Sequence, residues 1–177
     1  MKRIFLGIPI YEDQVEKFQK ELSNLKGLKL VPPENLHFTL KFLGSVEDNQ
    51  ILKIQESLKT IDWGNKFKIN IKGIGVFPNQ DYIKVIWLGV ETDQEIKSLF
   101  QKIEDKLGQQ FPQDFQFSAH LTLARVRFVE DKEKLLDFIR NKEIKIIETE
   151  INKVILYEST LGEAGPEYSV LEEYQLS

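Results

Sequence analysis

The tetrapeptide HFTL, at residues 37–40, returns as HLTL at residues 120–123, and the only two histidines of the chain lie in these copies. Side chains of a β-strand alternate between its two faces, so the histidine and threonine of each copy share one face. Apolar residues occupy the alternate positions in both copies and favour the buried face of a sheet. Each copy therefore predicts a strand that presents one imidazole and one hydroxyl away from the core.

The surroundings of the motif also repeat. A shift of 83 residues lays residues 37–52 on residues 120–135 without a gap. The identical pairs are His37/His120, Thr39/Thr122, Leu40/Leu123, Val46/Val129, Glu47/Glu130, Asp48/Asp131 and Leu52/Leu135. This echo predicts a strand, a turn and a helix that occur twice. We therefore expect two lobes related by a pseudo-two-fold axis, each of which gives one strand to a shared cleft.

The hydrophobic pattern along the chain predicts an α+β protein. Apolar residues recur at helical spacing in four segments, which are residues 15–25, 51–61, 96–107 and 132–140. Alternating or continuous apolar runs predict strands at residues 3–10, 36–42, 66–75, 82–90, 115–123, 144–157 and 168–176. The segment FPNQD, which begins at Phe77, predicts a hairpin loop between two of these strands.

Composition limits the classes of function. A chain of 177 residues suits one compact domain or two small lobes that share a core. The net charge of −4 gives no overall basic field, so a nucleic-acid partner would be engaged locally, at an end. The absence of cysteine excludes disulfides, thiolate zinc sites and cysteine nucleophiles. No apolar stretch approaches a membrane span, and the N-terminal segment favours a first strand over a signal peptide, so we expect a cytoplasmic domain without membrane contact.

Two imidazoles and two hydroxyls on one cleft suit acid–base chemistry on a phosphodiester. Imidazole titrates near neutrality, so one ring can accept a proton while the other donates one. Threonine hydroxyls can donate hydrogen bonds to the non-bridging oxygens. Metal binding is the competing use of the histidines, but two histidines without an acid on the same face make a poor set of ligands. The chain contains neither a G-x-S-x-G nucleophile elbow nor a G-x-x-x-x-G-K phosphate loop.

With these motifs in place, the chain resembles the 2H phosphoesterase superfamily, and within it the LigT-like RNA 2′,3′-cyclic phosphodiesterases, also called 2′-5′ RNA ligases. The segments that carry the likeness are MKRIFLGIPI, VPPENLHFTLKFLGSV, VIWLGV, AHLTLAR and LYESTLGEAGPEYSVLEEYQL. The resemblance implies a bilobal α+β fold, with antiparallel sheets lining the cleft and helices outside. It also implies that residues 1–177 form a single catalytic domain.

The resemblance further implies hydrolysis of an RNA 2′,3′-cyclic phosphate to a 2′-phosphate, without metal, ATP or another cofactor. It assigns His37 as the proton donor to the departing 3′ oxygen and His120 as the proton acceptor that activates water. Thr39 and Thr122 carry over as phosphate-binding residues. The expected partner is an RNA end that carries a cyclic phosphate, such as a tRNA fragment, or a small cyclic nucleotide, and the expected state is a monomer.

Supporting residues are less constrained by the pattern. Lys41 shares the predicted face of His37 and Thr39, so it either adds positive charge at the cleft or is a solvated lysine at a strand end. Arg125 matches the arginine of the family's second motif, but alternation puts it on the core face, so a bulge or a strand end must redirect it to reach a phosphate. The family usually has proline where this chain has Ala119. Phe77, in the predicted hairpin loop, either stacks on a base or caps the core.

Three other functions remain open at this point. The first is the reverse reaction, 2′-5′ RNA ligation, which water at high concentration makes the minor direction. The second is the same chemistry on a small cyclic nucleotide or on a cyclic phosphate of ADP-ribose. The third is a non-catalytic nucleotide- or RNA-binding module, although binding alone would not require two titratable groups.

Overall fold

The computed structural model describes residues 1–113, 116–163 and 165–177, and it confirms the α+β class. Four α-helices lie in this part of the chain: α1 (Asp13–Leu22), α2 (Asp48–Lys59), α3 (Gln94–Leu107) and α4 (Lys132–Asn141). A short 3-10 helix, η1, spans Pro33–Asn35. The strands are β1 (Lys2–Pro9), β2 (Leu28–Leu30), β3 (His37–Val46), β4 (Phe67–Pro78), β5 (Ile83–Val90), β6 (Leu121–Val126), β7 (Ile147–Ile151), β8 (Lys153–Gly162) and β9 (Gly165–Gln175).

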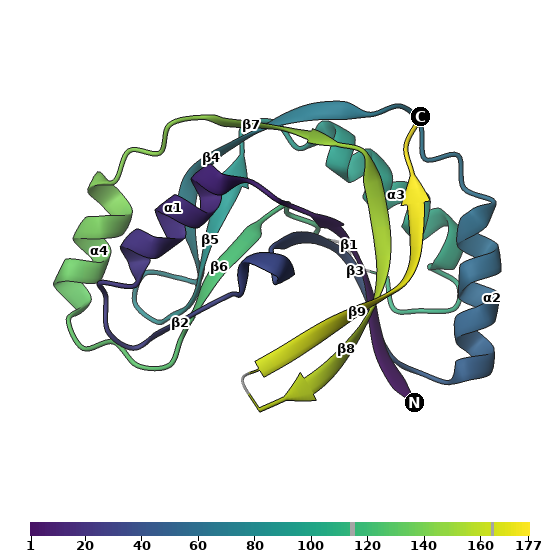
Figure 1. Cartoon of the computed structure of the whole chain (residues 1–177), viewed down its shortest axis with the longest axis horizontal. Helices are drawn as coiled ribbons and strands as arrows, with labels where there is room; N and C mark the ends of the chain where they lie inside the picture. Colours follow the sequence, from purple (N-terminus) through teal and green to yellow (C-terminus); the bar gives the residue numbers. More distant parts are fainter. Residues whose placement is uncertain (114–115, 164) are drawn as a thin grey trace.

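The strands form one curled antiparallel sheet with the order β7-β4-β5-β6-β3-β1-β8-β9, and β2 pairs with β6 beside this path. Helices α1 and α4 lie outside one end of the sheet, and α2 and α3 lie outside the other (Figure 1). The order is symmetric about the junction of β3 and β6, where Phe38 faces Leu121. These two residues are 83 positions apart, so the sheet has the pseudo-two-fold arrangement that the internal echo predicts.

The core lies between the helices and the adjoining face of the sheet. Motif residues Phe38, Leu40, Leu121 and Leu123 are all buried there, as the alternating pattern predicts. The helices turn their apolar sides toward them, and these sides include Val15 and Leu22 of α1 and Ile96, Leu99, Ile103 and Leu107 of α3. Because one face of the sheet is covered in this way, the histidine and threonine side chains are left for the other face.

Two predicted boundaries are wrong. The strand expected from residue 115 begins only at Leu121, and the residues from 116 to 120 are not in a strand. Phe117 in this segment stacks on Phe100 of α3 with ring centroids 4.5 Å apart, so contact with a helix replaces pairing in the sheet. Phe115, at the start of the predicted strand, lies outside the described residues. Phe77 and Pro78 form the end of β4, and they are not in the hairpin loop.

A β-bulge interrupts each motif at its leucine. In β3, Leu6 faces Lys41 but the next residue of β1, Gly7, faces Thr39, so Leu40 is the extra residue. In β6, Ile86 faces Ala124 and Trp87 faces Thr122, so Leu123 is the extra residue. A bulge reverses the alternation beyond it. Two successive residues are therefore buried in each strand, Leu40 with Lys41 and Leu123 with Ala124.

Buried polar side chains from the helices contact both bulged regions. Gln19 of α1 donates from Nε2 to the Leu123 carbonyl at 2.8 Å and to the Val31 carbonyl at 2.6 Å. Lys41 forms a buried ion pair with Glu104 of α3 and donates to the Pro112 carbonyl at 2.8 Å. These contacts supply partners inside the core, where an unpaired polar group is costly.

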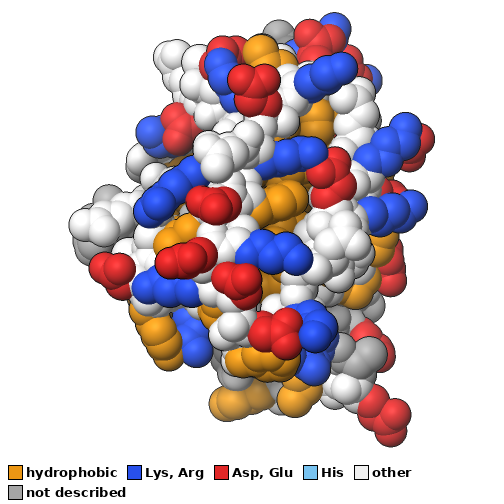
Figure 2. All heavy atoms as spheres, turned by 90° about the vertical axis from the view of Figure 1, so that its left-hand side faces the viewer, with side chains coloured by type: hydrophobic (Ala, Val, Ile, Leu, Met, Phe, Trp, Pro, Cys, Tyr) orange, Lys and Arg blue, Asp and Glu red, His pale blue; other side chains and the backbone are white. Residues whose placement is uncertain are grey.

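The end of the molecule that carries α1 and α4 has a surface of mixed charge. Figure 2 shows the end of the molecule that carries α1 and α4, where Lys and Arg side chains are interspersed with Asp and Glu side chains. Such mixing gives no continuous basic track for a polyanion on this face. Of the helices in the described part of the chain, none is both long and apolar enough to cross a membrane.

The buried ion pair gives a stability prediction. Lys41→Met should lower the free energy of unfolding by about 3–5 kcal/mol, because Glu104 would remain as an uncompensated buried charge. The double variant Lys41→Met/Glu104→Leu should recover most of this loss. Urea unfolding monitored by circular dichroism would measure both variants.

The matched control is Lys59→Met, which removes the half-exposed ammonium on α2 that pairs with Glu56 and Glu172. It should change the free energy of unfolding far less than Lys41→Met, because exposed ion pairs contribute little. Equal losses in the two single variants would contradict the assignment of Lys41 to the core.

Candidate active site

A cleft of about 490 Å³ lies on the face of the sheet that the helices leave free. Both copies of the motif line it, through His37 and Thr39 of β3 and through His120 and Thr122 at β6. Residues from the segment around η1 and from the start of β9 complete the walls. The structure thus brings together the four side chains that the sequence singles out.

The two imidazoles are held in the same way. Nδ1 of His37 lies 2.7 Å from the Asn35 carbonyl, and Nδ1 of His120 lies 2.8 Å from the Ser118 carbonyl. A carbonyl oxygen only accepts, so each Nδ1 carries a proton and donates it. In the neutral ring, Nε2 is then the nitrogen that can accept a proton. Nε2 of His37 accepts from the Thr39 hydroxyl at 3.0 Å.

His37 is half-buried among aromatic rings. The ring centroid of Phe5 lies 4.9 Å from that of His37, and Tyr168 makes an edge contact at 5.4 Å. Gly7 permits this packing, because a Cβ atom there would lie 3.1 Å from Cδ2 of His37. The pKa of the His37 imidazole is lowered from 6.5 to about 4, chiefly because burial disfavours the charged ring. The hydrogen bond to the Asn35 carbonyl raises the pKa, whereas the charges of His120 and Arg125 lower it further.

His120 has aromatic neighbours from β4 and β5, in its own half of the sheet. Phe77 makes an edge contact with centroids 5.0 Å apart, and Trp87 lies at 6.2 Å. Trp87 occupies the space above Gly75, where a Cβ atom would lie 2.1 Å from the indole ring. Phe77 was predicted either to stack on a base or to cap the core, and it lines the cleft beside the imidazole.

The bulges decide which supporting residues reach the cleft. Lys41 does not reach it, because the bulge at Leu40 turns the lysine into the core, so its predicted place on the face of His37 and Thr39 is wrong. Arg125 does line the cleft, through the redirection that strict alternation required. In β3 the corresponding position is Phe42, which is 69% exposed and also lines the cleft.

Sequence reasoning missed several cleft residues, and three of them carry large or charged side chains. Phe42 was assigned to the core face, although the 83-residue shift pairs it with Arg125 and so carried the signal. Lys29 of β2 and Tyr168 of β9 also line the cleft. Nothing in their local pattern distinguishes them from ordinary strand residues, because both are brought there by strands distant from the motifs.

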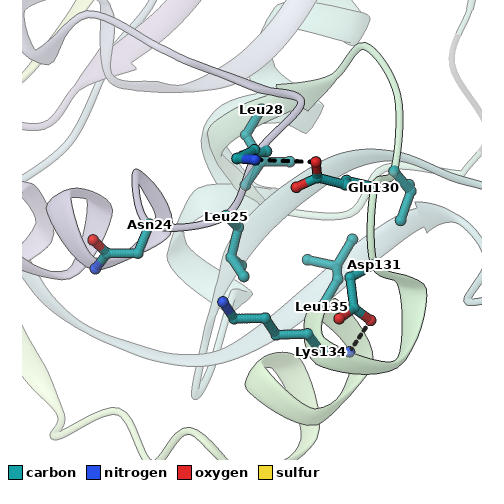
Figure 3. Close-up of a pocket in the computed structure, with 9 residues that line it drawn as sticks. Asn24, Leu25, Leu28, Glu130, Asp131, Lys134 and Leu135 are labelled. Carbon is teal, nitrogen blue, oxygen red and sulfur yellow. Dashed lines mark hydrogen bonds and ion pairs between the residues drawn. The ribbon is translucent and has the colours of Figure 1, made fainter.

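A second, smaller hollow of about 240 Å³ lies between the end of α1 and the start of α4 (Figure 3). Its acidic groups already have partners, because Glu130 pairs with Lys26 at 3.1 Å and Asp131 accepts from the Lys134 amide at 3.0 Å. It contains neither histidine. Across residues 1–113, 116–163 and 165–177, no group of three or more His, Cys, Asp or Glu side chains could hold a metal ion.

The cleft therefore has the composition of a two-histidine acid–base site with hydroxyl and guanidinium donors for an anion. Comparison with known families agrees with this description. Models of the LigT-like phosphoesterases match residues 8–87 and again residues 88–168, so each match contains one copy of the histidine motif. The chain belongs to the LigT-like phosphoesterase family.

Relatives of similar length span almost the whole chain. A Methanocaldococcus jannaschii protein named RNA 2′,3′-cyclic phosphodiesterase is 39% identical over 97% of this chain and 99% of its own length. A Thermotoga maritima protein of the same name is 32% identical over 98% of this chain and 95% of its own length. The family resemblance found in the sequence is thus confirmed.

Solved structures share the fold. A Thermus thermophilus structure matches with a TM-score of 0.76 and 25% identity, over 98% of this chain and 97% of that one. The structure of Escherichia coli LigT complexed with 3′-AMP matches with a TM-score of 0.76 and 18% identity, over 99% and 98% of the two chains. The bilobal arrangement expected from the repeat is that of this family.

The environment of His37 gives a titration prediction. In the free protein, the His37 imidazole should be neutral at pH 7 and should become protonated only near pH 4. Inorganic phosphate should raise this pKa, because an anion beside the ring favours the imidazolium. The Cε1–H resonance, followed by NMR against pH, measures both effects.

The chain has only two histidines, so the His120→Asn variant leaves one imidazole signal and assigns it to His37. A titration midpoint above pH 6 for His37 in this variant, measured without phosphate, would contradict the conclusion that burial lowers the pKa of this ring.

Proposed function

We propose that the chain hydrolyses 2′,3′-cyclic phosphodiester ends of RNA to 2′-phosphomonoesters, without metal or ATP. The observation that carries the proposal is the pair of imidazoles, each held at Nδ1 by a backbone carbonyl and each accompanied by a threonine in one cleft. The relatives named RNA 2′,3′-cyclic phosphodiesterase support this choice of substrate. Residues 1–177 act in the proposal as one catalytic domain, and a monomer suffices because one chain supplies both histidines.

The proposed reaction uses water as the nucleophile. His120 accepts a proton from water at Nε2 while the water oxygen forms a bond to phosphorus. The bond from phosphorus to the 3′ oxygen breaks, and His37 donates a proton from Nε2 to that oxygen. The product is a 2′-phosphomonoester with a free 3′ hydroxyl. His37 is then neutral and His120 protonated, so exchange with solvent restores the starting state.

The low pKa of His37 is compatible with its proposed role as the proton donor. A buried ring that holds its charge weakly is a strong acid once it is protonated. The negative charge of a bound phosphodiester favours the imidazolium and so raises the pKa of His37 in the complex. Binding of the substrate anion thus favours protonation of His37, and the protonated ring can then donate its proton.

Hydrogen-bond donors for the phosphate complete the proposed site. Thr39 and Thr122 present hydroxyls from the same strand faces as the histidines. Donors aimed at the non-bridging oxygens stabilise the charge that develops in the transition state. Arg125, further along β6 than Thr122, adds a permanent positive charge to the cleft beside these donors.

Product analysis tests the proposal. A short RNA with a 2′,3′-cyclic end, incubated with the protein and a chelator but without nucleotide, should yield a 2′-phosphate. His37→Asn and His120→Asn should each lower kcat by about 10²–10⁴-fold, since each removes one proton-transfer group. Asparagine can still donate from the position of Nδ1, so the bond to the carbonyl of Asn35 or Ser118 can be kept while Nε2 is lost.

The pH dependence of kcat/KM provides an independent readout. It should be bell-shaped in the wild-type protein, because one ring must be protonated and the other neutral. Each variant should lose one limb of the bell while its circular dichroism spectrum stays that of the folded protein. Wild-type turnover in either variant, or a 3′-phosphate as the product, would refute the proposed roles.

A further inference from the structure

Two cations stand side by side on the wall of the cleft formed by β2 and β6. Lys29 and Arg125 are direct partners in the antiparallel register of these strands. Directly opposed residues of an antiparallel pair point to the same face, with Cβ atoms about 4.5–5.5 Å apart. Both residues line the cleft. Gly165, at the start of β9, leaves room for the ammonium, because a Cβ atom there would lie 2.6 Å from Nζ of Lys29.

Two cations in this arrangement repel each other. Like charges that face each other across two strands destabilise a sheet. Within the described residues, neither Lys29 nor Arg125 forms an ion pair, whereas other lysines, such as Lys2 and Lys153, pair with glutamates. The cleft also contains Glu34 and Glu167, yet neither carboxylate pairs with the two cations. The chain has 28 acidic and 24 basic side chains, so the two cations are not left without ion pairs for lack of acidic residues.

The opposite wall of the cleft has different chemistry. Phe42 occupies the position in β3 that corresponds to Arg125 in β6, and Tyr168 of β9 lies beside His37. The two cations of the cleft thus lie on β2 and β6, whereas Phe42 and Tyr168 lie on β3 and β9. An anion that enters together with a nucleoside is therefore directed to the wall of Lys29 and Arg125.

The position of this pair relative to the histidines indicates which anion it receives. The bulge at Leu123 makes Arg125 the next residue of β6 after Thr122 to face the cleft, about 7 Å further along the strand. Thr122 belongs to the site proposed for the reacting phosphate. In RNA the next negative charge along the chain is the phosphodiester one nucleotide away.

We propose that Lys29 and Arg125 form a second phosphate site, which binds the phosphodiester preceding the terminal nucleotide of the RNA substrate. This inference rests on the proposed function and sharpens it. A mononucleotide has no such group, so Lys29 makes the enzyme prefer an RNA end to a small cyclic nucleotide.

Binding of product-like ligands tests the second site without depending on turnover. The probes are adenylyl-(3′→5′)-adenosine 2′-phosphate, which has the preceding phosphodiester, and adenosine 2′-phosphate, which lacks it. The wild-type protein should bind the dinucleotide more tightly. Lys29→Gln should weaken dinucleotide binding about tenfold and mononucleotide binding much less, because one charged contact is lost.

Salt dependence identifies the lost contact as a phosphate contact. The slope of log Kd against log salt for the dinucleotide should fall by about 0.7 in Lys29→Gln, as expected for one phosphate of a single strand. Lys29→Arg should retain the slope, because it keeps the charge. Lys53→Gln is the matched control, since this lysine is exposed on α2, outside the cleft, and both affinities should match the wild type.

Three results would overturn the second site. The wild-type protein could bind the dinucleotide no more tightly than the mononucleotide. Lys29→Gln could weaken the binding of both ligands equally, which would place Lys29 at the terminal phosphate. Lys29→Gln could also leave both affinities unchanged. Failure of the proposed function is a separate result, because it would appear as absent hydrolysis of a cyclic RNA end while these affinities can still be measured.

Discussion

The junction of β3 with β6 is the constraint on which the remaining architecture depends. Phe38 faces Leu121 there, and the two half-sheets extend away from this pair in mirrored order. Because the pair joins equivalent positions of the two motifs, the flanking histidines fall on the same face of one sheet. A slip of one residue in this register would turn one set of motif side chains to the opposite face. The pairing of the two histidines in one cleft thus depends on the register between the two halves of the sheet.

Much of this arrangement could be predicted from the sequence. Period-two alternation put Phe38 and Leu40 in the core and His37 and Thr39 on the free face, and the 83-residue echo gave the pseudo-symmetry. These predictions succeed because burial of apolar side chains decides which face of a strand is covered. The family resemblance added the expected roles of His37 and His120, which geometry alone does not distinguish, since both rings are anchored at Nδ1.

The wrong placements of Lys41 and Phe42 have one physical origin. Alternation assumes regular pairing, and the bulges at Leu40 and Leu123 break it, so Lys41 enters the core while Phe42 and Arg125 enter the cleft. A lysine between apolar neighbours gives no warning of burial, because its partner Glu104 lies 63 positions away on a helix. Lys29 and Tyr168 reach the cleft only through long-range pairing of β2 and β9, which a local pattern does not encode.

The backbone carbonyls that orient the histidines have a consequence for the substrates that the cleft can admit. An imidazole held by a carboxylate gains basicity, but it also brings a fixed negative charge close to the reacting group. Here Asn35 and Ser118 orient the rings through neutral dipoles, so neither anchor repels an incoming phosphate. The two rings lack the extra basicity that a carboxylate would give, but an anion can approach them without repulsion from the groups that orient them.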